Sequence, residues 1–276
     1  MVLRGVSVMD VNSERPLVSV IIASYNHATY IEQSIESVLA QTYPNIELLV
    51  VDDGSKDDSV QRIQQLQNKH GFSFVAQANK GLSRTLNESI ARARGALIAP
   101  FGSDDIMMPE RIALQVAYMQ DKPEVGICAG QIEIINADGQ PVKKRNRHLE
   151  RSHEVKRFDF EDIFRGAEGG PKAPTLLFRR EALEKVGGFD PQIRLEDLLI
   201  ELKITHAGYF IDVLGDVLAK YRVHESNTYK NHRFMVDNVL KSYGQFAGHP
   251  DYLEVCAEFR NSMILKAAKS DPKLAF

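Results

Sequence analysis

Apolar residues in the first half of the chain follow two alternating patterns. Short apolar runs at 18–22, 46–51, 72–76 and 96–99, the first of them rich in β-branched residues, are typical of strands buried in a parallel sheet. Between them, apolar residues recur at helical spacing over 31–39, 60–70 and 82–93. Thr29 and Glu32 have the spacing of a capping box for the first of these helices. Repeated strand–helix units predict right-handed crossovers and a parallel α/β sheet.

Acidic pairs stand where two of the expected strands end. Asp52 and Asp53 follow the second strand, and Asp104 and Asp105 follow the fourth. Ligands of parallel sheets bind beyond the carboxyl ends of the strands, where Tyr25 also falls. A buried carboxylate without a partner is costly, so these pairs predict a nucleotide and metal site, and hence an enzyme. For Asp52 alone, capping of its own turn is the better interpretation.

Size and charge narrow the class of protein. A chain of 276 residues with 43% hydrophobic content can bury one large core or two small ones, and we expect one catalytic domain followed by a helical tail. Apolar residues at helical steps over 235–263 predict that this tail packs on the domain or forms a homodimer. A net charge of −3 argues against general nucleic-acid binding.

Three features bear on location. No apolar run approaches the roughly 18 residues of a membrane span, and residues 1–16 lack the apolar core of a secretory signal. The two cysteines have no metal-ligand spacing, so a reducing cytoplasm is expected. The basic stretch at 143–148, continued by Arg151, Lys156 and Arg157, favours a solvated loop. Peripheral association with the inner face of the plasma membrane is the alternative.

Four segments in order, at 18–26 (VSVIIASYN), 50–55 (VVDDGS), 79–81 (NKG) and 103–105 (SDD), resemble the family 2 glycosyltransferases of the GT-A fold. Glu196-Asp197 and His224 extend the resemblance over roughly residues 16–228. It implies a mostly parallel central sheet flanked by helices. The expected units are an N-terminal extension (1–15), a GT-A domain (16–228) and a C-terminal helical extension (229–276). The domain divides into a nucleotide-binding half (16–108) and an acceptor-binding half (109–228).

The resemblance implies an inverting enzyme that moves a sugar from a nucleotide sugar, expected to be a UDP-sugar, to a hydroxyl of a saccharide or lipid-linked acceptor in surface polysaccharide or glycan synthesis. Mn²⁺ or Mg²⁺ would neutralise the departing diphosphate. By resemblance, Asp105 and His224 hold the metal and Asp104 holds the ribose. The other implied nucleotide-binding residues are Ala23, Tyr25, Asn26, Asp53 and Arg84. One departure is Gly102, where many relatives carry a further acid, which predicts a weaker or less essential metal.

An inverting transfer needs a base for the acceptor proton. Asp197 matches the family's base, and Glu196 is the adjacent fallback. The alternative is that this pair only opens a helix and interacts with its dipole. Arg84 could equally be a solvated helix residue, and His224 a structural one. The glycine- and proline-rich segment 166–174 is interpreted either as a mobile loop over the acceptor site or as a plain surface connection.

Two other functions compete with sugar transfer. A sugar nucleotidyltransferase would also use a parallel sheet, but the chain has no glycine-rich signature with a nearby basic residue at the first strand end. A catalytically idle nucleotide-sugar-binding protein is the second alternative, and the departure at Gly102 is the feature that favours it.

Overall fold

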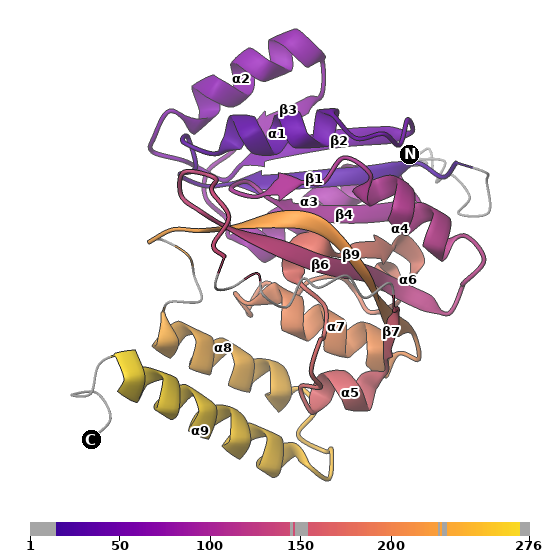
Figure 1. The fold of residues 1–276 in the computed structure, drawn as a ribbon, viewed down its shortest axis with the longest axis vertical. Coiled ribbons are helices and arrows are strands. Elements are labelled where there is room, and N and C mark those ends of the chain that lie inside the picture. Colours follow the sequence, from indigo (N-terminus) through magenta and orange to yellow (C-terminus); the bar gives the residue numbers. More distant parts are fainter. Residues whose placement is uncertain (1–14, 144–145, 147–153, 226, 228–230, 271–276) are drawn as a thin grey trace, which may run out of the picture.

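A central sheet organises the protein, and the computed structural model describes residues 15–143, 146, 154–225, 227 and 231–270 (Figure 1). The strands lie in the order β3-β2-β1-β4-β8-β6-β9-β5, and β7 also pairs with β9. Their bounds are β1 Val18–Ser24, β2 Ile46–Asp52, β3 Ser73–Ala76, β4 Leu97–Gly102, β5 Ile106–Met107, β6 Val125–Asn136, β7 Lys156–Phe158, β8 Leu177–Arg179 and β9 Phe210–Val223.

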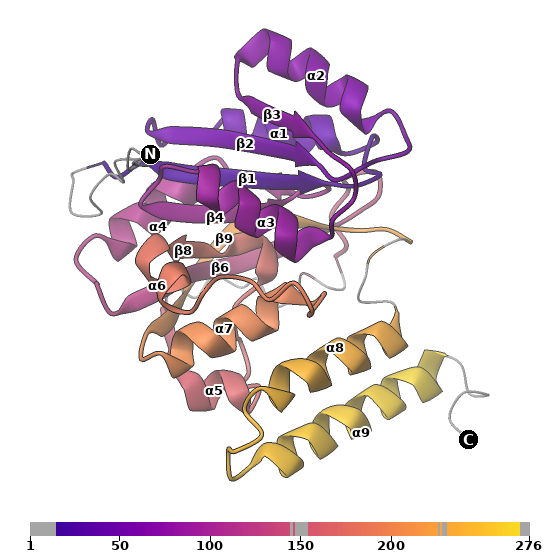
Figure 2. The same ribbon diagram turned by 180° about the vertical axis from the view of Figure 1, so that it is seen from behind.

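Helices cover both faces of the sheet (Figures 1 and 2). Their bounds are α1 Ile31–Leu39, α2 Ser59–His70, α3 Leu82–Arg92, α4 Arg111–Met119, α5 Phe160–Phe164, α6 Arg180–Lys185, α7 Glu196–His206, α8 His232–Gly244 and α9 Tyr252–Ser270, with a 3₁₀ turn, η1, at Ala173–Thr175. One hydrophobic core joins the sheet to α1, α2 and α4. The second core joins it to α3 and to α5 through α9.

Alternation along β1 shows how the sequence divides these two cores. Val18, Val20 and Ile22 are fully buried toward α1 and α4, whereas Ile21 is fully buried toward α3. Successive strand side chains point to opposite faces, so a run that is apolar at nearly every position requires a layer of helices on each side. The strand order and the two layers confirm the expected α/β class with a sheet flanked by helices.

The parallel arrangement expected from the sequence holds in the first half of the sheet. β1 pairs in parallel with β2 and β4, and β2 with β3. The second half is mixed, because β8 runs antiparallel to both β4 and β6 while β6 and β9 are parallel. The short β5 pairs antiparallel with β9, which brings the residues after β4 beside the end of β9.

The expected capping box at the first helix is wrong. Helix α1 begins at Ile31, and its N-cap is Tyr30, whose side chain makes no capping hydrogen bond. The Glu32 carboxylate instead forms an ion pair with Arg62 of α2, at 3.1 Å. A tertiary partner has therefore replaced the local one that the spacing indicated.

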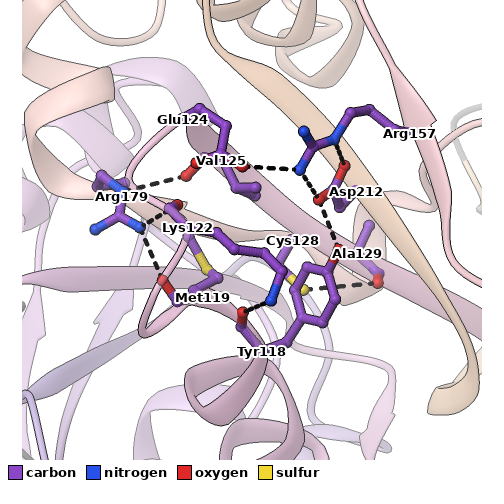
Figure 3. Close-up of polar contacts among 10 residues, drawn as sticks. All are labelled: Tyr118, Met119, Lys122, Glu124, Val125, Cys128, Ala129, Arg157, Arg179 and Asp212. Carbon is purple, nitrogen blue, oxygen red and sulfur yellow. Dashed lines mark hydrogen bonds and ion pairs between the residues drawn. The ribbon is translucent and has the colours of Figure 1, made fainter.

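An ion pair between a buried acid and a partly exposed arginine ties β7 to β9 (Figure 3). The fully buried Asp212 carboxylate accepts two hydrogen bonds from the Arg157 guanidinium, both at 2.8 Å, and one from the Tyr118 hydroxyl at 2.7 Å. The hydrogen bond to Asp212 raises the pKa of Arg157. Arg157, expected in a solvated basic loop, is therefore a structural residue at one end of that segment.

The C-terminal helices pack on the domain, which is one of the two arrangements predicted for the tail. α8 contacts α7, and α9 lies beside α8 at the end of the molecule away from α2 (Figures 1 and 2). Among the described residues, no helix combines the length and apolar character of a membrane span. The N-terminal extension up to residue 14, and the basic residues at 144–145, 147–148 and 151, lie outside the described residues.

Candidate active site

The carboxyl ends of β1, β2 and β4 meet at one edge of the sheet. Ser24 at the end of β1 pairs with Asp52, and Ala23 pairs with Gly102 at the end of β4. The loops that follow carry most of the residues that the sequence assigned to the nucleotide and the metal. Their common position confirms that these distant segments are brought to a single edge.

The loop after β1 is held in place by the loop after β2. Asn26 has a left-handed backbone, with φ of 55°, and its side-chain oxygen accepts a hydrogen bond from the Lys56 amide at 2.7 Å. The Asn26 amide donates to the Ser55 hydroxyl at 2.8 Å, and the Ala28 amide donates to Asp57 at 2.9 Å. Asn26 therefore has a structural role in this loop, whatever its contact with a ligand.

The two acids after β2 have different partners. Asp52 is fully buried and accepts hydrogen bonds from the Gly54 and Ser55 amides, at 3.2 and 2.8 Å, so it caps its own turn as expected. Asp53 accepts from the amides of Lys80 and Gly81, both at 2.9 Å. Burial raises the pKa of Asp53, but these bonds and one from a glutamine outweigh burial and hold the pKa below its ordinary value.

The remaining residues assigned to the nucleotide surround this edge. Tyr25 is 48% exposed, so its ring is accessible to a ligand. Ala23 is half-buried near the end of β1. Arg84 is exposed on the first turn of α3, which starts directly after the segment that binds Asp53. Their contacts with a nucleotide stay predictions.

Asp104 lies in a cluster with two histidines. The His224 Nε2 is 2.9 Å from the Asp104 Oδ2, and ligand atoms of His27, Asp104 and His224 all lie within 4.8 Å of one another. Burial raises the pKa of Asp104, but the hydrogen bond with His224 and the nearby His27 outweigh it and hold the pKa below its ordinary value. Burial lowers the pKa of His27, which favours a neutral imidazole. A carboxylate and two imidazoles at this separation suit a divalent metal ion.

Asp105 lies apart from this cluster, although the sequence analysis had paired it with His224. Its side chain is buried, and its Oδ1 accepts a hydrogen bond from the Arg222 amide on β9, at 2.9 Å. Burial and the adjacent charge of Asp104 raise the pKa of Asp105 well above its ordinary value. Neighbouring side chains in an extended segment point to opposite sides, so only one of the two acids can face His224, and that acid is Asp104.

His27 is the site residue that the sequence analysis missed. It follows directly on the recognised 18–26 segment, and its Nδ1 is 2.7 Å from the Ser103 hydroxyl. Its imidazole also meets His224 edge-on, with ring centroids 5.7 Å apart, while Tyr30 stacks on His224 at 5.2 Å. The signal available in the sequence was its place in a loop already assigned to the site.

Glu196 and Asp197, the predicted catalytic pair, lie in the first turn of helix α7. This position is also what the alternative interpretation, that the pair only opens a helix, predicted. Both side chains are half-buried. Burial and the adjacent charge of Asp197 raise the pKa of Glu196 to about 8, and burial raises the pKa of Asp197. At neutral pH these acids compete for charge, so one holds a proton more readily than an ordinary carboxyl does.

Glu201 is a second residue that the sequence analysis missed, and it lies one turn after Asp197 on the same side of α7. It is 8% exposed, and no hydrogen bond of its side chain is found among the described residues. Burial and the charge of Asp197 raise the pKa of Glu201 well above its ordinary value, and only Lys172 opposes them. Burying a charged carboxylate costs stability, so the fold favours the protonated form of Glu201.

The start of α7 is fastened to the nucleotide half through α3. The Asn87 side chain bonds the main chain of Phe189 in both directions, at 2.7 and 3.0 Å, and the Ser83 hydroxyl donates to the Ile193 carbonyl at 3.0 Å. The glycine turn before α7 depends on this approach. Gly188 has a φ of 72°, and a Cβ there would lie 2.7 Å from the Asn87 side-chain oxygen.

The segment 166–174 is anchored at its far end. Arg111, fully buried on α4, donates to the carbonyls of Pro174 and Leu176 at 2.6 and 3.0 Å. Burial lowers the pKa of Arg111 to about 9. Any movement of this segment over an acceptor must therefore take place before Pro174, and that movement stays a prediction.

Comparison with solved structures shows which fold this chain shares with other proteins. The fold is shared with solved glycosyltransferases of the GT-A type. A mannosyltransferase from Pyrobaculum calidifontis, solved with GDP-Man and Mn²⁺, superposes with a TM-score of 0.67 and 20% identity, covering 96% of this chain and 74% of that one. S. aureus TarS, solved with UDP-GlcNAc, gives a TM-score of 0.69 and 20% identity, covering 89% and 72%.

The chain belongs to glycosyl transferase family 2, whose sequence model matches residues 19–187. It is 31% identical over 220 residues to a Nostoc sp. protein named as an uncharacterized glycosyltransferase, covering 77% of this chain and 66% of that protein. It is 27% identical over 221 residues to the O-antigen biosynthesis glycosyltransferase WbnJ of Escherichia coli, covering 78% and 83%. The resemblance in the four short segments is thereby confirmed.

Proposed function

We propose that this protein transfers a sugar from a nucleotide-sugar donor to a hydroxyl of an acceptor, with inversion at the anomeric carbon. The observation that carries the proposal is the cluster of Asp104 with His27 and His224 at the carboxyl edge of the sheet, in a chain of this family. Neither the nucleotidyltransferase nor the idle-binder alternative gains support from the family match.

The donor is proposed to lie along the loops after β1, β2 and β4. Asp53 and the exposed Tyr25 would contact the base, Arg84 the base or the diphosphate, and Ala23 and Asn26 the rest of the nucleoside. UDP remains the proposed carrier, which agrees with the UDP-GlcNAc bound to TarS, whereas the mannosyltransferase holds GDP-Man. The nucleobase of the donor is therefore to be determined by a direct binding measurement.

Asp104 and His224 are proposed to hold the divalent ion, Mn²⁺ or Mg²⁺, in place of the earlier pair of Asp105 and His224. Their donor atoms meet at 2.9 Å, whereas Asp105 is engaged by the Arg222 amide. When bound, the ion would neutralise the charge that develops on the departing diphosphate. A role of Asp104 toward the ribose is then secondary.

Asp197 is proposed as the base on the acceptor side. Its carboxylate would take the proton of the acceptor hydroxyl while that oxygen bonds to the anomeric carbon and the bond to the diphosphate oxygen breaks. Burial and the charge of Asp197 raise the pKa of Glu196 to about 8, so Glu196 is less suited to accept a proton at neutral pH. The hydrogen bonds from Asp53 to the start of α3, and from α3 to the segment before α7, would fix the position of the catalytic base relative to the donor.

The acceptor is proposed to be a saccharide or a lipid-linked saccharide of a surface polysaccharide. Support comes from the O-antigen function named for the E. coli relative. A cytoplasmic location, with peripheral association at the inner membrane face, would bring the enzyme to such an acceptor. A homodimer formed through the C-terminal helices remains part of this proposal.

Calorimetric titration with UDP, GDP and dTDP, each with Mn²⁺ and again with excess chelator, tests the donor site. Metal-dependent preference for UDP is the expected result. A preference for GDP or dTDP would keep the transferase and replace the proposed carrier. No binding of any nucleotide, with or without metal, would contradict the proposed function.

A further inference from the structure

We infer that His27 is a third ligand of the metal site, so that two imidazoles and one carboxylate select a first-row transition ion over Mg²⁺. This inference rests on the proposed metal-dependent function and adds to it a ligand and a metal preference. The three side chains come from the loop after β1, the turn after β4 and the end of β9. They are the group among the described residues whose donor atoms could hold an ion together.

The orientation of His27 is built into the fold. Its amide donates to the Ser59 hydroxyl at 3.1 Å, which fixes the backbone of the loop against α2. Its Nδ1 lies 2.7 Å from the Ser103 hydroxyl, so Nε2 is the ring nitrogen left for an ion. Metal-bound imidazoles usually use their second nitrogen for such an orienting bond. Ser103 immediately precedes Asp104, and one turn therefore positions two ligands.

His224 is held just as firmly. Its amide donates to the Asn227 side-chain oxygen at 2.5 Å. The Tyr30 ring stacks on the His224 imidazole. The Arg222 guanidinium lies over the same Tyr30 ring, 4.8 Å from its centroid. A preorganised imidazole loses little freedom on binding an ion.

Gly102 explains why a third ligand must come from outside β4. A Cβ built on Gly102 would lie 2.7 Å from the Asp105 Oδ2 and 3.0 Å from the Asp104 Oδ1. An acid at this position would therefore displace one of the two carboxylates that are present. His27 occupies the same edge from another loop, so the missing acid is replaced by a nitrogen ligand.

The change of ligand type changes the expected ion. Mg²⁺ prefers an octahedron of oxygen atoms and binds imidazole poorly. Imidazole nitrogens suit Co²⁺, Ni²⁺, Cu²⁺ and Zn²⁺, and the affinity of such a site rises from Mn²⁺ through Co²⁺ and Ni²⁺ to Cu²⁺. Two histidines beside a single acid should therefore bind Co²⁺ more tightly than Mn²⁺, and Mn²⁺ more tightly than Mg²⁺.

The test uses the full chain, freed of metal, with ions alone as probes. Co²⁺ is followed by its visible absorption, and Mn²⁺ and Mg²⁺ by calorimetry. We expect His27→Gln to weaken Co²⁺ binding tenfold or more and to reduce the preference for Co²⁺ over Mg²⁺, and Ser103→Ala to weaken it by about 10-fold. His27→Asp should move the preference toward Mg²⁺. His70→Gln, on the exposed end of α2, is the matched control and should bind as the unaltered protein does.

Unchanged Co²⁺ affinity in His27→Gln, with circular dichroism showing a folded variant, would overturn the inference. So would equal affinity of the unaltered protein for Co²⁺ and Mg²⁺. These outcomes are separate from failure of the proposed function, because they need no nucleotide. If Mg²⁺ supports nucleotide binding as well as Co²⁺ does, the transferase stands while the selectivity inferred here is wrong.

Discussion

The His224 imidazole meets the Asp104 carboxylate at 2.9 Å, across 120 residues of sequence. This contact joins the end of β9 to the end of β4 at the edge where the sheet presents its loops. The side chain of Asp105, the next residue, faces the other way and accepts a hydrogen bond from the Arg222 amide. Two adjacent acids thus have different partners, a histidine side chain for Asp104 and the main chain of β9 for Asp105.

Substitution of these two acids should separate binding from stability. Asp104→Asn is expected to abolish metal-dependent nucleotide binding, and it should lower the free energy of unfolding less than loss of Asp105 does, because the Asn oxygen can still accept a hydrogen bond from His224. Asp105→Ala leaves a buried amide without its acceptor and should lower the free energy of unfolding by about 1–3 kcal/mol. Both variants are measured by calorimetry and by circular dichroism in urea. Equal losses of stability in the two would contradict this division.

The pH dependence of transfer distinguishes the two acids that open α7. If Asp197 is the base, Asp197→Asn should abolish turnover and leave donor binding intact. Glu196→Gln should keep most of the activity and leave the rising limb of the pH–rate profile nearly in place, because burial and the charge of Asp197 raise the pKa of Glu196 and Asp197 therefore ionises first. If Glu196 is the base instead, activity of the unaltered protein should rise with an apparent pKa near 8, and Glu196→Gln should be inactive.

Glu201 should make the fold less stable as pH rises. The folded protein holds the proton of this buried acid more tightly than the unfolded chain, because burial raises the pKa of Glu201. The resulting stability is fully present below the ordinary glutamate pKa of about 4.3 and declines as pH rises toward the folded pKa. Glu201→Gln and Glu201→Leu should therefore unfold at higher urea concentration at pH 8, with little gain at pH 4.

Glu258→Gln, on an exposed position of α9, controls for the loss of one negative charge. If Glu258→Gln gains as much stability at pH 8 as Glu201→Gln does, the gain comes from the change in net charge. The burial of Glu201 would then not be its cause. Activity of Glu201→Gln is informative as well. A stabilised but inactive variant would indicate that the acid is retained for a task at the acceptor side.

The sequence predicted the arrangement of the strand ends more successfully than the direction of the side chains. Buried runs separated by helices fix which ends share an edge, so Asp53 and Asp104 could be placed there in advance. Alternation shows that Asp104 and Asp105 point apart, but not which of them faces His224. That choice depends on the pairing of β5 with β9, between residues more than one hundred positions apart.

His27 and Glu201 show why the remainder of the site could not be predicted. The role of His27 follows from Ser103, which is 76 positions away, and an isolated histidine carries no pattern. The helical spacing places Glu201 on the side of Asp197, yet its burial depends on how α5, α7 and α8 pack. The error at Thr29 has the same origin, since the Arg62 partner of Glu32 comes from another helix.

Removal of Arg157 should destabilise the second half of the sheet, because Asp212 would remain fully buried with the Tyr118 hydroxyl as its principal side-chain partner (Figure 3). Arg157 is 41% exposed, so water can reach part of the site, and we expect Arg157→Met to lower the free energy of unfolding by about 1–3 kcal/mol. Asp212→Asn in the same background should recover part of the loss, because the amide carries no charge to bury.

Arg165→Met is the matched control for this last prediction. Arg165 pairs with Glu161 and Asp251 at the surface, where exposed ion pairs contribute little, so this substitution should hardly change urea unfolding. A loss as small in Arg157→Met as in Arg165→Met would show that the buried carboxylate finds other donors. A large loss without recovery in the double variant would assign the effect to the packing of Arg157 on Phe210, where the guanidinium lies 4.8 Å from the ring centroid.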